Sequence, residues 1–229
     1  MNFEVMGADR WRHVHDLADM GGEHWKLFLT GDKEGTGLRL SAEPRQNPPD
    51  LRVDFKDRSD VDGSPPHDVP DVRHALVFET PPLDRPTEVA GLFSATLDVT
   101  TNKHDFDLAI DLYELTSDGR WRDISSFLGR ASYVQDRTTR HLLVPGTPTR
   151  LDITSQTVAG RLMAKGSRLV AVVSVPKGPD RQINYGTGRD VSDESIEDAD
   201  TPLRLSFSAS SSLVVGIDPA GDRQVPASP

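Results

Sequence analysis

The sequence predicts an all-β protein: an antiparallel β-sandwich of the jelly-roll type, with long irregular loops and no substantial helices. Three observations predict this class. Short segments in which apolar and polar residues alternate recur along the 229-residue chain, which is typical of strands with one buried face. Patterns of helical period are confined to patches of about one or two turns. Glycine and proline separate the segments, and no long helix of the kind that joins parallel strands lies between them.

The expected strands follow from this patterning. In the segment that begins at residue 89, Phe93 and Leu97 face one way while Ser94 and Asp98 face the other. Residues 169–175 are almost continuously apolar, which predicts a central strand covered on both faces. In chain order, the expected strands are residues 25–30, 38–42, 51–56, 75–80, 89–100, 108–112, 150–154, 169–175, 203–208 and 213–217.

The remaining stretches are expected to be short helical patches or loops. Residues 56–74 exceed the roughly 12–15 residues at which structureless connections become uncommon, so they are expected to be a binding loop or disordered. Residues 176–202 form a second long connection. A single domain over residues 1–217 is expected, followed by a flexible tail at 218–229 that has little to bury. The helix-like patches are residues 14–20, 126–131 and 195–199.

Composition narrows the classes of partner. The chain has 36 acidic and 26 basic side chains, a formal net charge of −10, which argues against nucleic acid and anionic membranes as partners. No window is apolar over the roughly 18 residues that a membrane span needs. The N-terminus lacks a secretory pattern, which favours a cytoplasmic over a secreted location. The absence of cysteine excludes disulfides, thiolate zinc sites and cysteine nucleophiles.

The sequence shows no self-contained catalytic machinery. A serine-hydrolase nucleophile elbow needs a glycine two residues before and after the serine, and no serine here has both. The HExxH, GxxxxGK[ST] and GxGxxG motifs are also missing. We therefore expect no catalytic residue and no cofactor in this chain.

Two groups of residues have the chemistry of metal ligands. His13 and His15 would share one strand face, and we favour a polar face over a metal site because no third ligand has a defined position. Asp105 and Asp107, beside His104, either supply oxygens to calcium or cap turns. Turn capping is favoured because the glycine-centred spacing of an EF-hand is missing.

Two loops, residues 182–190 and 191–200, follow one another in the second long connection. Residues 182–190 contain glycines but precede no convincing helix, so a loop with positive-φ glycines is favoured over a phosphate cradle. Tyr185 is expected to pack on the domain edge. The acidic residues 191–200 are expected to form a solvated loop with one helical turn, with Ser192 as a candidate N-cap.

A series of short segments follows a recognisable order along the chain. They are FEVMGADRW from Phe3, KLFL from Lys26, LVFETPPLDRPTEVAG from Leu76, DFDLAIDLYELTSDGR from Asp105, GRASY from Gly129, LVPG from Leu143, KGSRLVAVVSV from Lys165 and PLRLSF from Pro202. In this order they resemble the C-terminal jelly-roll domain of the X-Pro dipeptidyl-peptidase and cocaine esterase group of serine hydrolases. That group includes α-amino acid ester hydrolases and bacterial acylases.

The resemblance implies a three-part enzyme. An α/β-hydrolase domain with a Ser-Asp-His triad and a helical cap would lie upstream of the segment FEVMGADRW, in the same polypeptide. The sandwich would pack on both and act on a small ester or peptide substrate only through the parent enzyme. A loop of the sandwich would approach the active site, and the matching residues here are Pro65, Pro66 and His67. The isolated domain would expose an apolar patch and could self-associate.

A different class of function stays open beside this one. The chain could be a free-standing jelly-roll module that binds carbohydrate or another ligand, supported by calcium through Asp105 and Asp107. Trp11, Trp25 and Trp121 would then form an aromatic platform for sugars, although packing in the core or at an interface is the more usual role of scattered tryptophans.

Overall fold

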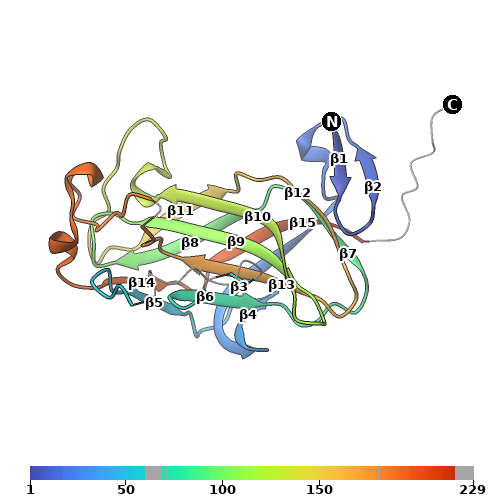
Figure 1. The fold of residues 1–229 in the computed structure, drawn as a ribbon, viewed down its shortest axis with the longest axis horizontal. Coiled ribbons are helices and arrows are strands. Elements are labelled where there is room, and N and C mark those ends of the chain that lie inside the picture. The colour runs from blue at the N-terminus through green and yellow to red at the C-terminus, as the bar shows by residue number, and fades with distance from the viewer. Residues whose placement is uncertain (60–68, 71, 180, 220–229) are drawn as a thin grey trace.

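The computed structural model of the protein describes residues 1–59, 69–70, 72–179 and 181–219. Strands account for nearly all of its regular structure (Figure 1). They are β1 Asn2–Val5, β2 Arg10–His13, β3 Glu23–Glu34, β4 Gly37–Ser41, β5 Asp50–Val53, β6 Ala75–Glu79, β7 Thr87–Gly91, β8 Ser94–Thr101, β9 Asp107–Leu115, β10 Trp121–Arg130, β11 Thr149–Thr154, β12 Ala159–Met163, β13 Arg168–Ser174, β14 Leu203–Phe207 and β15 Ser212–Pro219.

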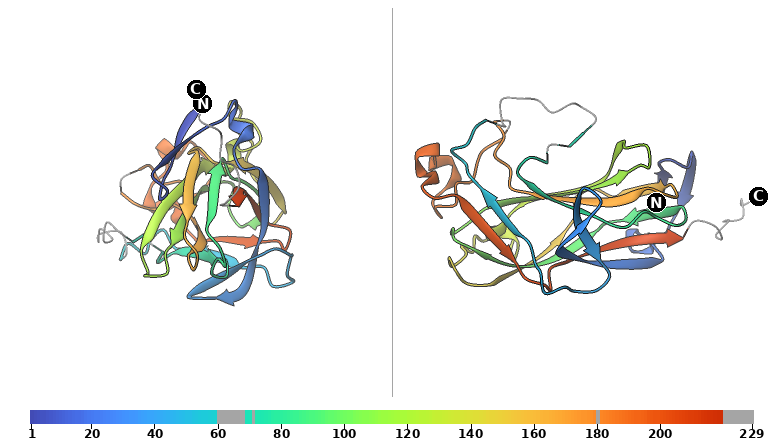
Figure 2. Two further views of the ribbon diagram at one scale, coloured as in Figure 1. Left: turned by 90° about the vertical axis from the view of Figure 1, so that its right-hand side faces the viewer. Right: turned by 90° about the horizontal axis from the view of Figure 1, so that it is seen from below.

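Thirteen strands join one sheet that curls round its own core (Figure 2). The order is β10-β9-β13-β6-β4-β3-β15-β8-β14-β5, while β11 pairs with β8 and β7 lies between β12 and β15. The hairpin β1–β2 forms a separate sheet at one end of the sandwich (Figure 1). The predicted all-β sandwich class is confirmed.

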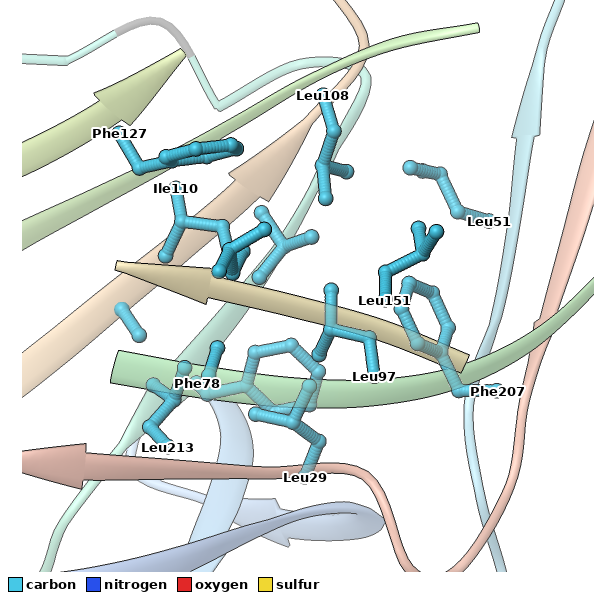
Figure 3. Packing of buried hydrophobic residues seen from close by; sticks show 14 of the residues in the cluster. Leu29, Leu51, Phe78, Leu97, Leu108, Ile110, Phe127, Leu151, Phe207 and Leu213 are labelled. Carbon is cyan, nitrogen blue, oxygen red and sulfur yellow. The ribbon is translucent and has the colours of Figure 1, made fainter. Parts of the chain in front are cut away.

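The core lies between the two layers of this curled sheet. Ile110 of β9 and Phe127 of β10 come from one layer, and Leu97 of β8 and Leu151 of β11 come from the other (Figure 3). These side chains alternate with outward-facing polar ones, so the period-two pattern of the sequence records which face is buried. Each fully buried large apolar side chain contributes about 1.5–3 kcal/mol.

The central strand predicted at residues 169–175 is confirmed. β13 pairs with β9 on one side and β6 on the other, and all five side chains from Leu169 to Val173 are buried. The predicted antiparallel pairing has one exception. β4 and β6 run parallel, with Leu38 opposite Phe78, whereas every other ladder between named strands in the described residues is antiparallel.

Each expected strand overlaps an observed one, but the strands β1, β2 and β12 were not predicted, and two of the expected elements were wrong. The segment 89–100 is two strands, β7 and β8, separated at residues 92–93. The helix-like patch 126–131 lies mostly in β10. Two features interrupt the alternation of this strand. A register shift between Asp123 and Ser125 buries the adjacent Ile124 and Ser125 together, and the apolar Leu128, 39% exposed, follows the buried Phe127 directly.

The helical elements of the described residues are short 3-10 turns of three or four residues. Ser192 is not an N-cap, because Asp190 holds that position and accepts a hydrogen bond from the Ser192 amide at 2.9 Å. Nothing helical within the described ranges has the length and apolarity of a membrane span. The turns are η1 Leu17–Asp19, η2 Ala131–Tyr133, η3 Val191–Asp193 and η4 Ile196–Ala199.

All three of the expected irregular stretches fall partly outside the described residues. Pro65, Pro66 and His67 lie among residues 60–68, which the structure does not describe. At the C-terminus, β15 continues to Pro219, two residues past the expected domain boundary at 217. The carboxylate of Asp218 accepts a hydrogen bond from the Gly22 amide at 2.8 Å, so this residue belongs to the fold.

Candidate functional site

The acidic strand end that was a candidate calcium site is an ion-pair cluster. Asp105 is fully buried beside β9, and its carboxylate accepts hydrogen bonds from the Ser132 hydroxyl at 2.7 Å and from Arg140 Nη2 at 3.0 Å. The amides of Phe106 and Ser132 donate to its other oxygen at 2.9 and 3.0 Å. Asp107 holds the Arg130 guanidinium through two bonds, of 2.8 and 3.2 Å. We refer to Asp105, Asp107, Arg130, Ser132 and Arg140 as the loop latch.

The loop latch compensates the charge of its two aspartates with arginine and serine partners. A buried carboxylate is costly unless hydrogen bonds and an opposite charge compensate for its lost hydration. Asp105 has both, and it therefore ties the chain that follows β10 back to the start of β9. The bond to Asp107 raises the pKa of Arg130. The carboxylates of Asp105 and Asp107 thus have arginine partners, and the described residues hold no group of three or more His, Asp or Glu side chains placed to bind a metal.

Ser132 lacks the geometry of a nucleophile. Its hydroxyl donates directly to a carboxylate, whereas an activated serine needs an imidazole or amine base that takes its proton. It is also 1% exposed, which removes it from any substrate in solvent. Arg130 and Ser132 of the motif GRASY therefore bond to Asp107 and Asp105 of the segment DFDL. Neither segment reveals this pairing by itself.

The glycine loop at residues 182–190 does gather backbone amides around an anion, but the anion is a side chain of this protein. The carboxylate of Glu194 accepts hydrogen bonds from the amides of Tyr185 at 2.7 Å and Thr187 at 2.9 Å. Gly186 and Gly188 have φ of +80° and +89°, as predicted for this loop. Tyr185 is buried with its ring edge-to-face against Phe55, at 5.5 Å between centroids, and so belongs to the core.

The outer face of β9 carries a second electrostatic feature. Burial raises the pKa of Asp111 to about 6, and the nearby carboxylate of Asp123 on β10 adds to the shift. Burial also raises the pKa of the Tyr113 hydroxyl, with Asp111 and Asp123 contributing. The Tyr113 ring packs edge-to-face on Trp121, at 5.5 Å between centroids. Asp111 therefore lies in a poorly hydrated setting on this face, near the exposed carboxylate of Asp123.

The three tryptophans occupy different settings. Trp121 packs edge-to-face on Tyr113, Trp25 of β3 packs partly buried against the core, and Trp11 of β2 is 70% exposed. His13 and His15 lie beyond Trp11, with ring centroids 5.8 Å apart. His13 ends β2 and His15 follows the strand, and the His13 ring is hydrogen-bonded to Asn2 at 2.6 Å.

The start of the segment 56–74 is firmly anchored although its middle lies outside the described residues. The buried Lys177 amine donates to the carbonyls of Asp57 at 2.8 Å and Asp54 at 3.3 Å. Arg58 in turn donates to the Lys177 carbonyl at 2.8 Å. Hydrogen bonds from serine at position 59 lower the pKa of Asp57. The chain thus leaves β5 on a fixed path toward the segment that was predicted to meet substrate.

A buried glutamate that the sequence analysis missed fixes the N-terminal hairpin. Glu88 of β7 has a side chain that is 1% exposed, and it forms ion pairs with Arg10 and Arg12 of β2. Arg12 also donates to Asp218 of β15 at 2.6 Å. Burial alone would lower the pKa of Arg12, but its bonds to Asp218 and Glu88 outweigh this effect and raise it. We refer to Arg10, Arg12, Glu88 and Asp218 as the hairpin clasp.

Comparison with protein families gives a match over residues 2–196 to the X-Pro dipeptidyl-peptidase C-terminal non-catalytic domain. No curated protein matches the sequence.

Three solved structures are similar in fold. An aminopeptidase from the marine sediment archaeon Thaumarchaeota archaeon has a TM-score of 0.74 and 19% identity, covering 93% of this chain and 39% of its own. An α-amino acid ester hydrolase has a TM-score of 0.70 and 18% identity, covering 85% of this chain and 36% of its own. A CocE/NonD family hydrolase from Staphylococcus aureus has a TM-score of 0.66 and 15% identity, covering 94% of this chain and 40% of its own. The chain therefore spans about two fifths of the length of each.

Proposed function

Because the chain belongs to the X-Pro dipeptidyl-peptidase C-terminal non-catalytic domain family, we propose that it serves a serine hydrolase as an accessory domain packed on the catalytic domain. The family match over residues 2–196 carries this proposal. The hydrolase and peptidase names of the similar structures, and the two-fifths coverage of each, support it.

In the proposed assembly the chemistry belongs to the catalytic domain. Its serine attacks the carbonyl of an ester, an α-amino acyl ester or an X-Pro peptide and forms an acyl-enzyme. Its histidine takes the serine proton and passes it to the leaving group, and its aspartate orients the histidine. The sandwich contributes rigidity and a surface that limits the substrate pocket, since positioning of the substrate accounts for much of an enzyme's advantage.

The proposed pocket wall consists of Pro65, Pro66 and His67. What supports it is the anchoring of the preceding chain by Lys177, because a contact surface at a pocket must be held within a fraction of an ångström of its working position. Replacing His67 with Ala in the complete hydrolase should raise KM about tenfold with kcat nearly unchanged, which corresponds to the loss of about 1.4 kcal/mol of binding. The matched control is His24→Ala on β3, another histidine of this chain. Equal kinetic constants for both variants would contradict the pocket-wall role.

The proposed function is tested by labelling the native protein. An antibody to this chain captures the protein from lysate of its source cells, and a fluorophosphonate probe marks any active serine nucleophile. We expect the label on a polypeptide much larger than 25.2 kDa that contains this chain, or on a hydrolase captured with it. A captured species of 25.2 kDa with no labelled companion would overturn the proposal.

A further inference from the structure

Exposed apolar side chains gather at the beginning of this domain. Among the described residues, nine large apolar side chains are exposed, and four of them fall within the first 17 positions. They are Met1 at 44%, Met6 at 40%, Trp11 at 70% and Leu17 at 38%. A soluble domain buries its tryptophans when it can, so an exposed one among other exposed apolar residues indicates an interaction surface.

The hairpin β1–β2 presents Trp11 on one defined face. Directly opposed residues of an antiparallel pair point to the same side, and Trp11 is opposite Glu4. The alternate positions point the other way, where Val5 is fully buried and Arg12 reaches Glu88. Trp11 therefore lies on the side of the hairpin that faces away from the sandwich, and we call this side the outer hairpin face.

The outer hairpin face is held rigidly. The hairpin clasp ties Arg10 and Arg12 to a buried carboxylate, and the backbone of Met6 is hydrogen-bonded to β12 in both directions. These bonds run from the Met6 amide to the Gly160 carbonyl at 2.8 Å and from the Leu162 amide to the Met6 carbonyl at 2.9 Å. A flexible arm would lose conformational entropy on binding, whereas a fixed face avoids most of that cost.

We propose that the outer hairpin face, with Trp11 at its centre, is the surface on which the hydrolase catalytic domain docks. This inference rests on the proposed function and adds which part of the domain makes the contact. The matched family is a C-terminal domain whose match starts at residue 2, so the catalytic domain of such a protein joins the sandwich at the start of β1. A connection of a few residues, each spanning at most about 3.6 Å, would place a preceding domain beside this hairpin.

The chemistry of the face fits a domain–domain contact. Interfaces within a chain bury about 600–1,500 Å² and are more polar than obligate ones. Trp11 and Met6 would supply the apolar centre, and the paired rings of His13 and His15 with Glu4 would supply a polar border. Aromatic residues and methionine are enriched at the centres of such interfaces.

Site-specific photocrosslinking in the native, full-length protein tests this proposal. Trp11 is replaced by the photoreactive residue p-benzoylphenylalanine, which is also large and aromatic, so the exposed position tolerates it. The control carries the same residue in place of Val144, which is 63% exposed in the connection between η2 and β11. That connection lies at the other end of the sandwich from the hairpin (Figure 1).

The proposal expects position 11 to crosslink to peptides of a fluorophosphonate-reactive domain at least tenfold more than position 144. If the hydrolase is present but position 11 gives no excess of crosslinks, or crosslinks to a second copy of this chain, the docking face is wrong while the proposed function stands. If the preparation contains no fluorophosphonate-reactive domain, both fail. The urea unfolding midpoints of the two variants are measured as a control. Equal midpoints would show that a difference in crosslinking does not come from misfolding.

Discussion

At the scale of single residues, buried carboxylates determine where the loops of this domain lie. Asp105 and Glu88 are almost wholly removed from water, and each is compensated by arginines that are distant in sequence. Losing such a partner leaves an uncompensated buried charge, which costs more than the pair itself contributes. The two positions therefore allow direct tests.

Removing the Asp105 carboxylate should destabilise the fold strongly. Asp105→Ala removes the acceptor of Arg140 Nη2 and of the Ser132 hydroxyl together with the buried charge that Arg140 compensates, and a cost of about 3–5 kcal/mol in the free energy of unfolding is expected. The control is Asp152→Ala, since Asp152 and Arg150 form an exposed pair worth about 0–1 kcal/mol. Urea unfolding measures both. A loss below about 1 kcal/mol for Asp105→Ala would mean that the loop latch is not structural.

Asp111 should make stability depend on pH. Its pKa is raised to about 6 in the folded protein, so the protonated form is favoured by folding and the associated stability is lost as pH rises from about 4 through 6. The shift from 3.8 corresponds to about 3 kcal/mol, which solvent screening of a half-buried side chain reduces to about 1–2 kcal/mol. Asp111→Asn should therefore be more stable than the parent by that amount at pH 8.

Urea unfolding of parent and Asp111→Asn at pH 4, 6 and 8 measures this effect. At pH 4 the two proteins should converge, because Asp111 is then protonated in the folded state. A difference that does not change with pH would assign the effect of the substitution to packing instead of charge.

At the scale of elements, the hairpin clasp should decide how rigid β1 and β2 are. Glu88→Gln removes the charge that holds Arg10 and Arg12, at a cost of about 1–3 kcal/mol from weakened hydrogen bonds. Amide exchange should accelerate in residues 2–13 more than in β8 and β9. Asp118→Asn, which breaks an exposed pair with Arg120, is the control. Unchanged exchange in the hairpin would show that β12 and the pair between Arg12 and Asp218 hold it without the charge of Glu88.

The alternation of apolar and polar residues predicts most of the strands, because burial on one face of a sheet imposes a period of two. β10 escaped prediction because its bulge at residues 123–125 breaks that period. The hairpin strands β1 and β2 are four residues each, too short for periodicity to establish them. The sequence placed Asp105 and Asp107 together, but their partners Arg140 and Arg130 are 35 and 23 residues away, a distance that only the fold closes.

At the scale of the whole molecule, the outer hairpin face should govern the behaviour of the isolated domain. An exposed apolar surface that lacks its partner favours self-association. We expect the 229-residue chain to form dimers or larger species at high concentration in sedimentation velocity. The double variant Met6→Ser, Trp11→Ser should shift the distribution toward monomer, and Val144→Ser should not. Equal sedimentation distributions of all three proteins would contradict self-association through the outer hairpin face.

We propose that this domain works with a catalytic partner and has no chemistry of its own. Enzyme assays test this proposal. A simple acyl ester, an α-amino acyl ester and an X-Pro anilide are each given to the purified chain and to the native protein. We expect no turnover by the purified 229-residue chain. The native protein captured from its source cells should turn over at least one substrate, and fluorophosphonate should abolish that turnover. Turnover by the purified chain alone would contradict it.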